Sequence, residues 1–206
     1  MKNDYTGGGV RISIPPTVMF SVHEKIHNSR FGFTSDFKGQ GEGIYILGFT
    51  DREVAGSEVS SELGMNAGRV PHVDSSSAGK RYVALHEAIQ RRLVSACHDL
   101  SDGGLGVTFA EMALGGRCGA EIDFALVPAD DMTATELLYS ESASGLRVSV
   151  PESAREAFGE HVEGQIYARI GEPTAPPRVV VKMSGGLLLD EKIEDLARAF
   201  KATLDW

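Results

Sequence analysis

Apolar residues recur along the chain in short blocks, and the spacing within each block predicts a strand or a helix. Compact apolar runs bounded by glycine, proline or polar residues are typical of strands. They predict strands at 10–14, 17–22, 44–48, 120–124, 146–150, 166–170, 179–183 and 187–189. Apolar residues three or four positions apart are typical of one helix face. This spacing predicts helices over about 80–96, 105–114, 152–162 and from 193 onward.

Local signals sharpen several of these boundaries. Gly115-Gly116 is expected to end the helix over 105–114. Ser149 and Glu152 have the spacing of a capping box around Pro151. The polar turn 53–58 is expected to open a further helix, with Ser57 as its cap. Helices mixed with adjacent strands in this order predict an α+β fold, a mostly antiparallel sheet with packed helices.

The first forty residues differ in character from the rest. They contain a hairpin-like pair of apolar runs without a helix to cover them, followed by the polar, glycine-bearing stretch 36–42. We therefore expect residues 1–39 to be the tail of a preceding domain and residues 40–206 to form the main domain.

Composition narrows the class of protein. The 206 residues are 42% hydrophobic and carry a net charge of −9, which argues against nucleic acid or an anionic membrane as the main partner. The sequence has no apolar run of about 18 residues and no charged-then-apolar leader. The two cysteines, Cys97 and Cys118, are too few for a disulfide framework. A cytoplasmic protein with reduced thiols is expected.

One segment concentrates polar chemistry where a helix ends and a buried helix begins. It carries an imidazole, two carboxylates, a hydroxyl and two glycines: His98, Asp99, Ser101, Asp102, Gly103 and Gly104. Free amides and the helix dipole favour a phosphate near the glycines. Asp99 and Asp102 are oxygen ligands of the kind that hold Mg²⁺ beside phosphates. On the residues alone, Ser101 or Asp102 capping the helix, with His98 in a structural role, explains the segment as well.

A second polar cluster groups hydroxyls around one carboxylate: Ser140, Glu141 and Ser142. Such a group can bind a polar ligand or satisfy local backbone groups, and the residues alone favour the structural role. No cysteine, histidine and acid occur together in a nucleophile context, so no catalytic residue is assigned.

The stretch 98–116 (HDLSDGGLGVTFAEMALGG) strongly resembles phosphoribosylformylglycinamidine synthase, the amidotransferase-coupled ATP enzyme of purine synthesis. The resemblance covers nearly the whole chain in the same order, including residues 14–17, 36–38, 43–48, 56–58, 70–74 and 138–142. It implies the fold of the C-terminal domain of the aminoimidazole ribonucleotide synthetase superfamily.

The family resemblance also implies an arrangement of domains. The synthase subunit is internally duplicated, and each half has an ATP-site domain followed by a cover domain. Residues 1–39 resemble the end of the second ATP-site domain, and residues 40–206 resemble the second, C-terminal cover domain. The chain is therefore expected to be a C-terminal fragment, inactive when isolated.

The reaction that the resemblance implies converts formylglycinamide ribonucleotide, ATP and glutamine-derived ammonia to the amidine, ADP and phosphate. The implied cofactors are ATP and Mg²⁺. The implied partners are the rest of the synthase chain, with its first half and ATP-site domain, and a glutaminase domain or subunit. Two alternatives remain: a non-catalytic half-domain that packs the pseudo-dimer, and a sister ATP-dependent synthetase or kinase.

The resemblance implies nucleotide or phosphate contacts for both polar clusters: His98, Asp99, Ser101, Asp102, Gly103, Gly104, Ser140, Glu141 and Ser142, with Asp99 and Asp102 as metal ligands. One departure stands out. Relatives commonly follow Ser-Glu-Ser-x-Ser with arginine, whereas Gly145 stands there in this chain and Arg147 follows two residues later. A shift of two residues along a strand keeps the face but moves the side chain by about 7 Å.

Overall fold

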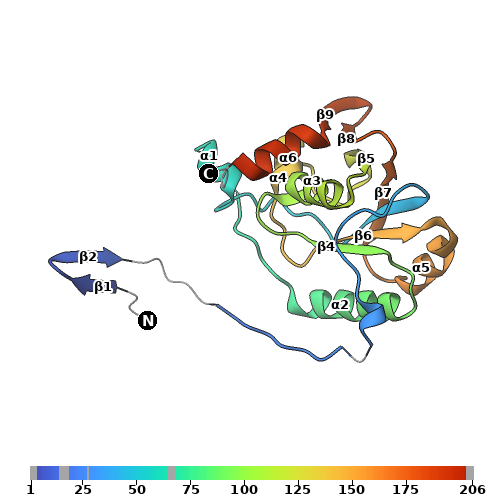
Figure 1. Ribbon diagram of the computed structural model, residues 1–206, viewed down its shortest axis with the longest axis horizontal. Helices are drawn as coiled ribbons and strands as arrows, with labels where there is room; N and C mark the ends of the chain where they lie inside the picture. Colours follow the sequence, from blue (N-terminus) through green and yellow to red (C-terminus); the bar gives the residue numbers. More distant parts are fainter. Residues whose placement is uncertain (1–3, 14–18, 27, 65–67, 203–206) are drawn as a thin grey trace. The chain divides into compact units, whose positions relative to one another are not determined.

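The computed structural model (Figure 1) describes residues 4–13, 19–26, 28–64 and 68–202. The chain divides into two compact units, residues 1–30 and 31–206. In the first unit, strands β1 (Asp4–Gly7) and β2 (Val10–Ser13) form an antiparallel hairpin in which Tyr5 faces Ile12. The predicted strand over 10–14 is thus confirmed as far as Ser13, and Ile14 lies outside the described residues.

The strand predicted at 17–22 is wrong where the structure describes it. Residues 19–22 belong to no strand, and residues 17 and 18 lie outside the described part. Met19, Phe20 and Val22 are each more than four-fifths exposed. An apolar run becomes a strand only when a neighbouring strand binds its backbone, and none of the described residues does so here.

The second unit is built on one sheet with the strand order β4-β6-β3-β7-β5-β8-β9. The strands are β3 (Glu42–Leu47), β4 (Ala96–Asp99), β5 (Gly119–Asp123), β6 (Leu146–Pro151), β7 (Tyr167–Thr174), β8 (Arg178–Met183) and β9 (Gly186–Lys192). Neighbours are antiparallel except for β5 and β8, which run parallel. The expected α+β fold with a mostly antiparallel sheet is therefore confirmed.

Helices cover the sheet on both faces (Figure 1). The covering helices are α2 (Ser75–Gln90), α3 (Gly104–Gly116), α4 (Ala134–Tyr139), α5 (Arg155–His161) and α6 (Ile193–Ala202). A further short helix, α1 (Glu58–Glu62), contributes no residue to either core cluster. Short 3-10 turns occur at Ser29–Phe31, Phe124–Leu126 and Glu152–Ala154. Leu204, expected on the closing helix, lies outside the described residues.

The two-residue period of β3 explains the two cores. Ile44 and Ile46 point into a large cluster with α3, α4 and α6, whereas Tyr45 and Leu47 point into a second cluster with α2 and α5. All four side chains are buried. The sheet is thus covered on both faces around β3 and supports the segments that follow its strands.

The helix predicted over 80–96 begins and ends earlier. Asp74 caps α2 by accepting hydrogen bonds from the amides of Ser76 and Ser77, and the helix ends at Gln90. Ala96, expected on the helix face, instead opens strand β4. The first polar cluster therefore begins within a strand, at His98 and Asp99 of β4, and does not directly follow a helix.

Two other local predictions are wrong: the helix end at Gly115-Gly116 and the capping box of Ser149 and Glu152. Gly115 and Gly116 lie inside the last turn of α3, and Arg117 ends the helix with φ of 48°. Ser149 is buried within β6 and caps no helix, because a strand from Leu146 continues to Pro151. Ser57, by contrast, caps α1 as expected by accepting a hydrogen bond from the amide of Ser60.

The glycine at the end of α3 is required by close approach. A Cβ at Gly116 would lie 2.2 Å from the carbonyl oxygen of Phe37. Phe37 is buried, and its amide donates to the carbonyl of Met112 at 3.1 Å. The segment before β3 is thus bound directly to α3. The assignment of 1–39 and 40–206 to two functional domains stays a prediction.

None of the helices in the described part of the chain is long and apolar enough to cross a membrane.

We predict opposite effects for alanine at two helical glycines. Gly116→Ala should destabilise the fold by about 1–3 kcal/mol, because the added methyl meets backbone that cannot move easily. Gly79→Ala in α2 has open space around the new methyl and should stabilise by about 0.5–1 kcal/mol. Urea unfolding of both variants measures the difference, and equal stability of the two would contradict the packing argument.

Candidate ligand site at the start of helix α3

The turn between β4 and α3 is shaped by two consecutive glycines in the left-handed region. Gly103 has φ of 80° and Gly104 has φ of 64°. A Cβ at Gly104 would lie between 2.7 and 2.9 Å from backbone atoms of residues 138–140, at the end of α4. A side chain at position 104 would separate the two helices. The glycine therefore brings the two polar clusters of the sequence, 98–104 and 140–142, side by side.

The first amides of α3 already have partners within the chain. The amide of Gly103 donates to Glu141 Oε1 at 2.8 Å, and the amide of Gly104 donates to the carbonyl of Ser101 at 3.1 Å. The carboxylate of Glu141 thus occupies the place where the helix dipole favours an anion. Neither Ser101 nor Asp102 caps the helix with its side chain, because Gly103 is the N-cap residue.

The two serines beside Glu141 bind the loop that follows β3. Ser140 Oγ accepts from the amide of Glu53 at 3.0 Å and donates to the carbonyl of Asp51. Ser142 Oγ accepts from the amide of Asp51 at 2.8 Å. Both hydroxyls are buried. In this arrangement the second cluster ties α4, the loop after β3 and the start of α3 together.

In the first cluster the side chain of His98 is partly buried, whereas those of Asp99 and Asp102 are exposed. His98 is 15% exposed in its side chain; its Nδ1 lies 2.9 Å from the carbonyl oxygen of Asp99, and its Nε2 lies 3.2 Å from Glu111 Oε2. Asp99 accepts from Ser101 Oγ at 3.0 Å, and its side chain is 69% exposed. Asp102 is exposed too. The two carboxylates expected to hold a metal are therefore both accessible.

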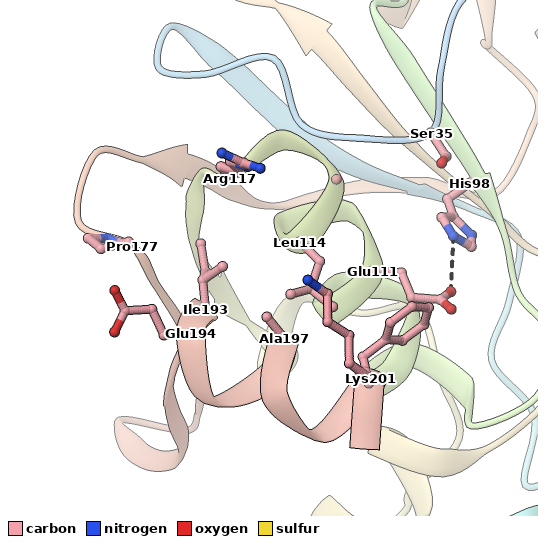
Figure 2. A pocket seen from close by; sticks show the side chains of 12 residues that line it. Ser35, His98, Glu111, Leu114, Arg117, Pro177, Ile193, Glu194, Ala197 and Lys201 are labelled. Carbon is pink, nitrogen blue, oxygen red and sulfur yellow. Dashed lines mark ion pairs between the residues drawn. The ribbon is translucent and has the colours of Figure 1, made fainter. Parts of the chain in front are cut away.

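His98 also borders a cavity of about 840 Å³ between α3 and α6. Figure 2 shows the pair His98–Glu111 at one side of it and Leu114, Ile193 and Ala197 across its apolar floor. The sequence patterns gave Glu111 no role; it lies about two helix turns into α3. Its partner His98 comes from β4, so the pair depends on the tertiary fold.

Arg147 lies two residues after Gly145, the position at which this chain departs from the resemblance. It is 1% exposed, and a Cβ at Gly145 would lie only 2.9 Å from its Nη1. Burial lowers the pKa of Arg147 to about 9. The guanidinium thus reaches back to residue 145 and lies in space that the glycine leaves open. Cys97, on the neighbouring strand, has a pKa raised to about 12 by burial, so its thiol is neutral.

The described residues do not by themselves complete a metal site. Among the residues that the structure describes, no three histidine, cysteine or acidic side chains are grouped so that they could hold an ion. Asp99 and Asp102 could supply carboxylate ligands only together with oxygens from another molecule.

Comparison with known proteins places these features in a family. Residues 39–184 match the model of the AIR synthase related protein, C-terminal domain. The phosphoribosylformylglycinamidine synthase subunit PurL of Thermococcus sibiricus is 38% identical over 120 residues, which is 58% of this chain and 17% of that protein. The chain therefore spans less than a fifth of this relative.

Solved structures show the same fold. Thermotoga maritima PurL complexed with FGAR superposes with a TM-score of 0.72 at 23% identity, over 82% of this chain and 30% of that chain. The same protein complexed with ATP gives 0.66 at 22% identity, over 82% and 28%. The hydrogenase maturation protein HypE in complex with ATP gives 0.55 at 19% identity, over 78% and 53%.

We predict that Glu141 stabilises the start of α3. Glu141→Ala leaves the amide of Gly103 without its partner and should cost about 1–2 kcal/mol. Glu141→Gln keeps an acceptor oxygen and loses only the charge, so its cost should be smaller. Urea unfolding measures both, with the exposed Glu163→Gln as a control that should stay within ~0.5 kcal/mol of the parent. A Glu141→Ala variant as stable as that control would contradict the role.

Proposed function

We propose a function from one premise: the chain belongs to the family of AIR synthase related proteins and contains their C-terminal domain. It is the C-terminal part of a phosphoribosylformylglycinamidine synthase. The whole enzyme converts formylglycinamide ribonucleotide, ATP and ammonia to formylglycinamidine ribonucleotide, ADP and phosphate. The observation that carries this proposal is the 38% identity to a PurL subunit over 120 residues.

The geometry supports the same function. The two segments on which the sequence resemblance rests most, 98–116 and 138–142, are separated by more than twenty residues, yet Gly104 packs directly on the end of α4. Residues that together allow two backbone segments to pack closely are expected to be kept together in the members of a family. This unit would close over a nucleotide site formed by the rest of the synthase.

The remaining parts of the enzyme lie outside this chain. Residues 1–39 would be the end of the second ATP-site domain, and residues 40–206 the second cover domain. The first half of the synthase and a glutaminase domain or subunit would supply the substrate site and the ammonia. A cytoplasmic location is part of the proposal, and the free thiols of Cys97 and Cys118 support it.

ATP and Mg²⁺ fit the residues at the turn. Thermotoga maritima PurL has been observed with ATP. Asp99 and Asp102 are exposed carboxylates at the entry to α3, and Mg²⁺ commonly binds one or two carboxylates together with phosphate oxygens. When bound, the ion would neutralise charge on the phosphates. His98 and Ser101 would orient Asp99. A phosphate could reach the amide of Gly103 only by displacing Glu141, so Gly103 and Gly104 would mainly shape the turn.

A second candidate is a packing role without nucleotide contact. It is favoured by the internal partners of Ser140, Glu141 and Ser142, which are bound to backbone amides of the same chain. Under this alternative the segment 98–104 fixes the pseudo-dimer interface and the glutaminase contact, and the loop 140–142 holds that segment in place. The remaining alternative, a sister ATP-dependent synthetase or kinase, is supported by the fold alone. The similarity to HypE is of this kind.

The proposal predicts that the isolated chain is inactive. The full-length protein should form formylglycinamidine ribonucleotide from its substrate, ATP-Mg²⁺ and ammonia, and the 206-residue chain should not. The reason is that the chain holds less than a third of the matched synthase structures. Product formation measured by chromatography tests both. Amidine synthesis by the 206 residues alone, or none by the full-length protein, would refute the assignment.

The role of the turn is tested by Asp102→Asn in the full-length protein. Loss of one carboxylate near the nucleotide should weaken ATP-Mg²⁺ binding about tenfold, measured by calorimetry. The exposed Asp130→Asn is the matched control and should bind like the parent. Unchanged nucleotide affinity together with a lower unfolding midpoint would favour the packing role instead.

A further inference from the structure

A second pocket lies beside the start of α2, away from the turn before α3. Its volume is about 200 Å³. The loop after β3, the first turns of α2 and the bend at Ala143 and Ser144 line it. Its lining includes residues of two stretches on which the sequence resemblance rests, 70–74 and Ser-Glu-Ser-x-Ser, but the proposed function assigns the pocket no ligand.

Arg81 of α2 is the buried cation of this pocket. It is 9% exposed, and its Nη1 donates to the carbonyl oxygen of Ser144 at 2.7 Å and to Ser144 Oγ at 2.9 Å. Its Nε is buried and has no hydrogen-bond partner among the described residues. A Cβ at Gly48, which has φ of 112°, would lie 3.1 Å from Arg81 Cζ. The glycine therefore admits the guanidinium against the backbone.

Arg147 stands behind the same bend. Ser144 is bound to Arg81, and the next residue, Gly145, leaves the space beside Arg147 Nη1. The Nε and Nη1 of Arg147 are also buried and lack hydrogen-bond partners in the part of the chain described. The charge of Arg81 contributes to lowering the pKa of Arg147, after burial. Ser144 itself has φ of 68°, a conformation rare for a residue other than glycine.

The carboxylates that line the pocket are bound to other groups. Asp51 lies 3.3 Å from the guanidinium of Arg69, and Glu53 accepts from the amide of His72 at 2.8 Å. Asp74 caps α2. Within the described residues, no ion pair to a carboxylate is formed by Arg81 or Arg147. Two buried guanidinium groups therefore share one bend without a direct ion pair, although the charge of Asp99 raises the pKa of Arg147 against the effect of burial, and the carboxylates of Glu53 and Asp74 line the pocket. Burial of a guanidinium without an ion pair is costly unless an anion is bound.

We propose that this pocket binds a phosphoryl group, held by Arg81 and the hydroxyl of Ser144 and stabilised at longer range by Arg147. A doubly charged oxyanion balances two unpaired cations, whereas a carboxylate balances only one. Ser77, in the first turn of α2, also lines the pocket. Its hydroxyl donates to Asp74 at 3.3 Å, and the Asp74 carboxylate already occupies the N-terminus of the helix. This site is separate from the Asp99–Asp102 turn and does not depend on the proposed function.

The test uses calorimetry with inorganic phosphate on the full-length protein at constant ionic strength. Arg81→Met keeps most of the apolar stem and removes the charge. It should weaken one phosphate site by at least about tenfold. Arg91→Met, at an exposed position just after the same helix, should leave every site unchanged. Acetate should compete with phosphate only weakly, and equal competition would assign the site to carboxylates.

A second variant guards against loss of folding. Arg147→Met replaces a buried charge by a side chain of similar volume, so without phosphate the urea midpoint should stay equal or rise. Its phosphate affinity should fall several-fold. A lower midpoint with unchanged affinity would make Arg147 a structural residue and overturn its part in the site. Phosphate binding like the parent in both variants would overturn the site itself, whatever the amidine assay gives.

Discussion

The backbone at the end of α4 lies so close to Gly104 that no side chain fits between them. This contact joins the entry of α3 to the loop 140–145. Because of it, Glu141 reaches the amide of Gly103, and the serines on either side reach the loop after β3. The positions of the conspicuous polar residues in the sequence thus follow from one approach of two backbones.

Most strands of the sheet were predictable from local apolar runs, but β4 was missed because Ala96 fits the spacing of the preceding helix. The runs at 44–48, 146–150 and 179–183 are apolar and bounded by glycine, proline or charge, and each became a strand within a residue or two. Helix ends were less predictable. Gly115-Gly116 has the composition of a helix stop, yet Gly116 serves contact with Phe37, eighty residues earlier. Local pattern cannot separate a glycine chosen for its φ from one chosen for its size.

The candidate site divides in the same way. The residue types at 98–104 and 140–142 pointed to a polar centre, but not to their internal partners, since Gly103 and Glu141 are 38 positions apart. No motif or pattern in the sequence singled out Arg81. On a helix of mixed polarity an arginine is expected in solvent, and only the arrival of Ser144 and Gly48 from other parts of the chain buries it.

The loop 140–145 is therefore the element on which both candidate sites depend. Glu141 binds the start of α3, Ser140 and Ser142 bind the loop after β3, and Ser144 binds Arg81. A ligand at the turn before α3 meets one end of this loop, and an anion beside α2 meets the other. Because the hydroxyls between these ends are buried and bonded to backbone, a displacement at one end must be transmitted or resisted by the same few hydrogen bonds.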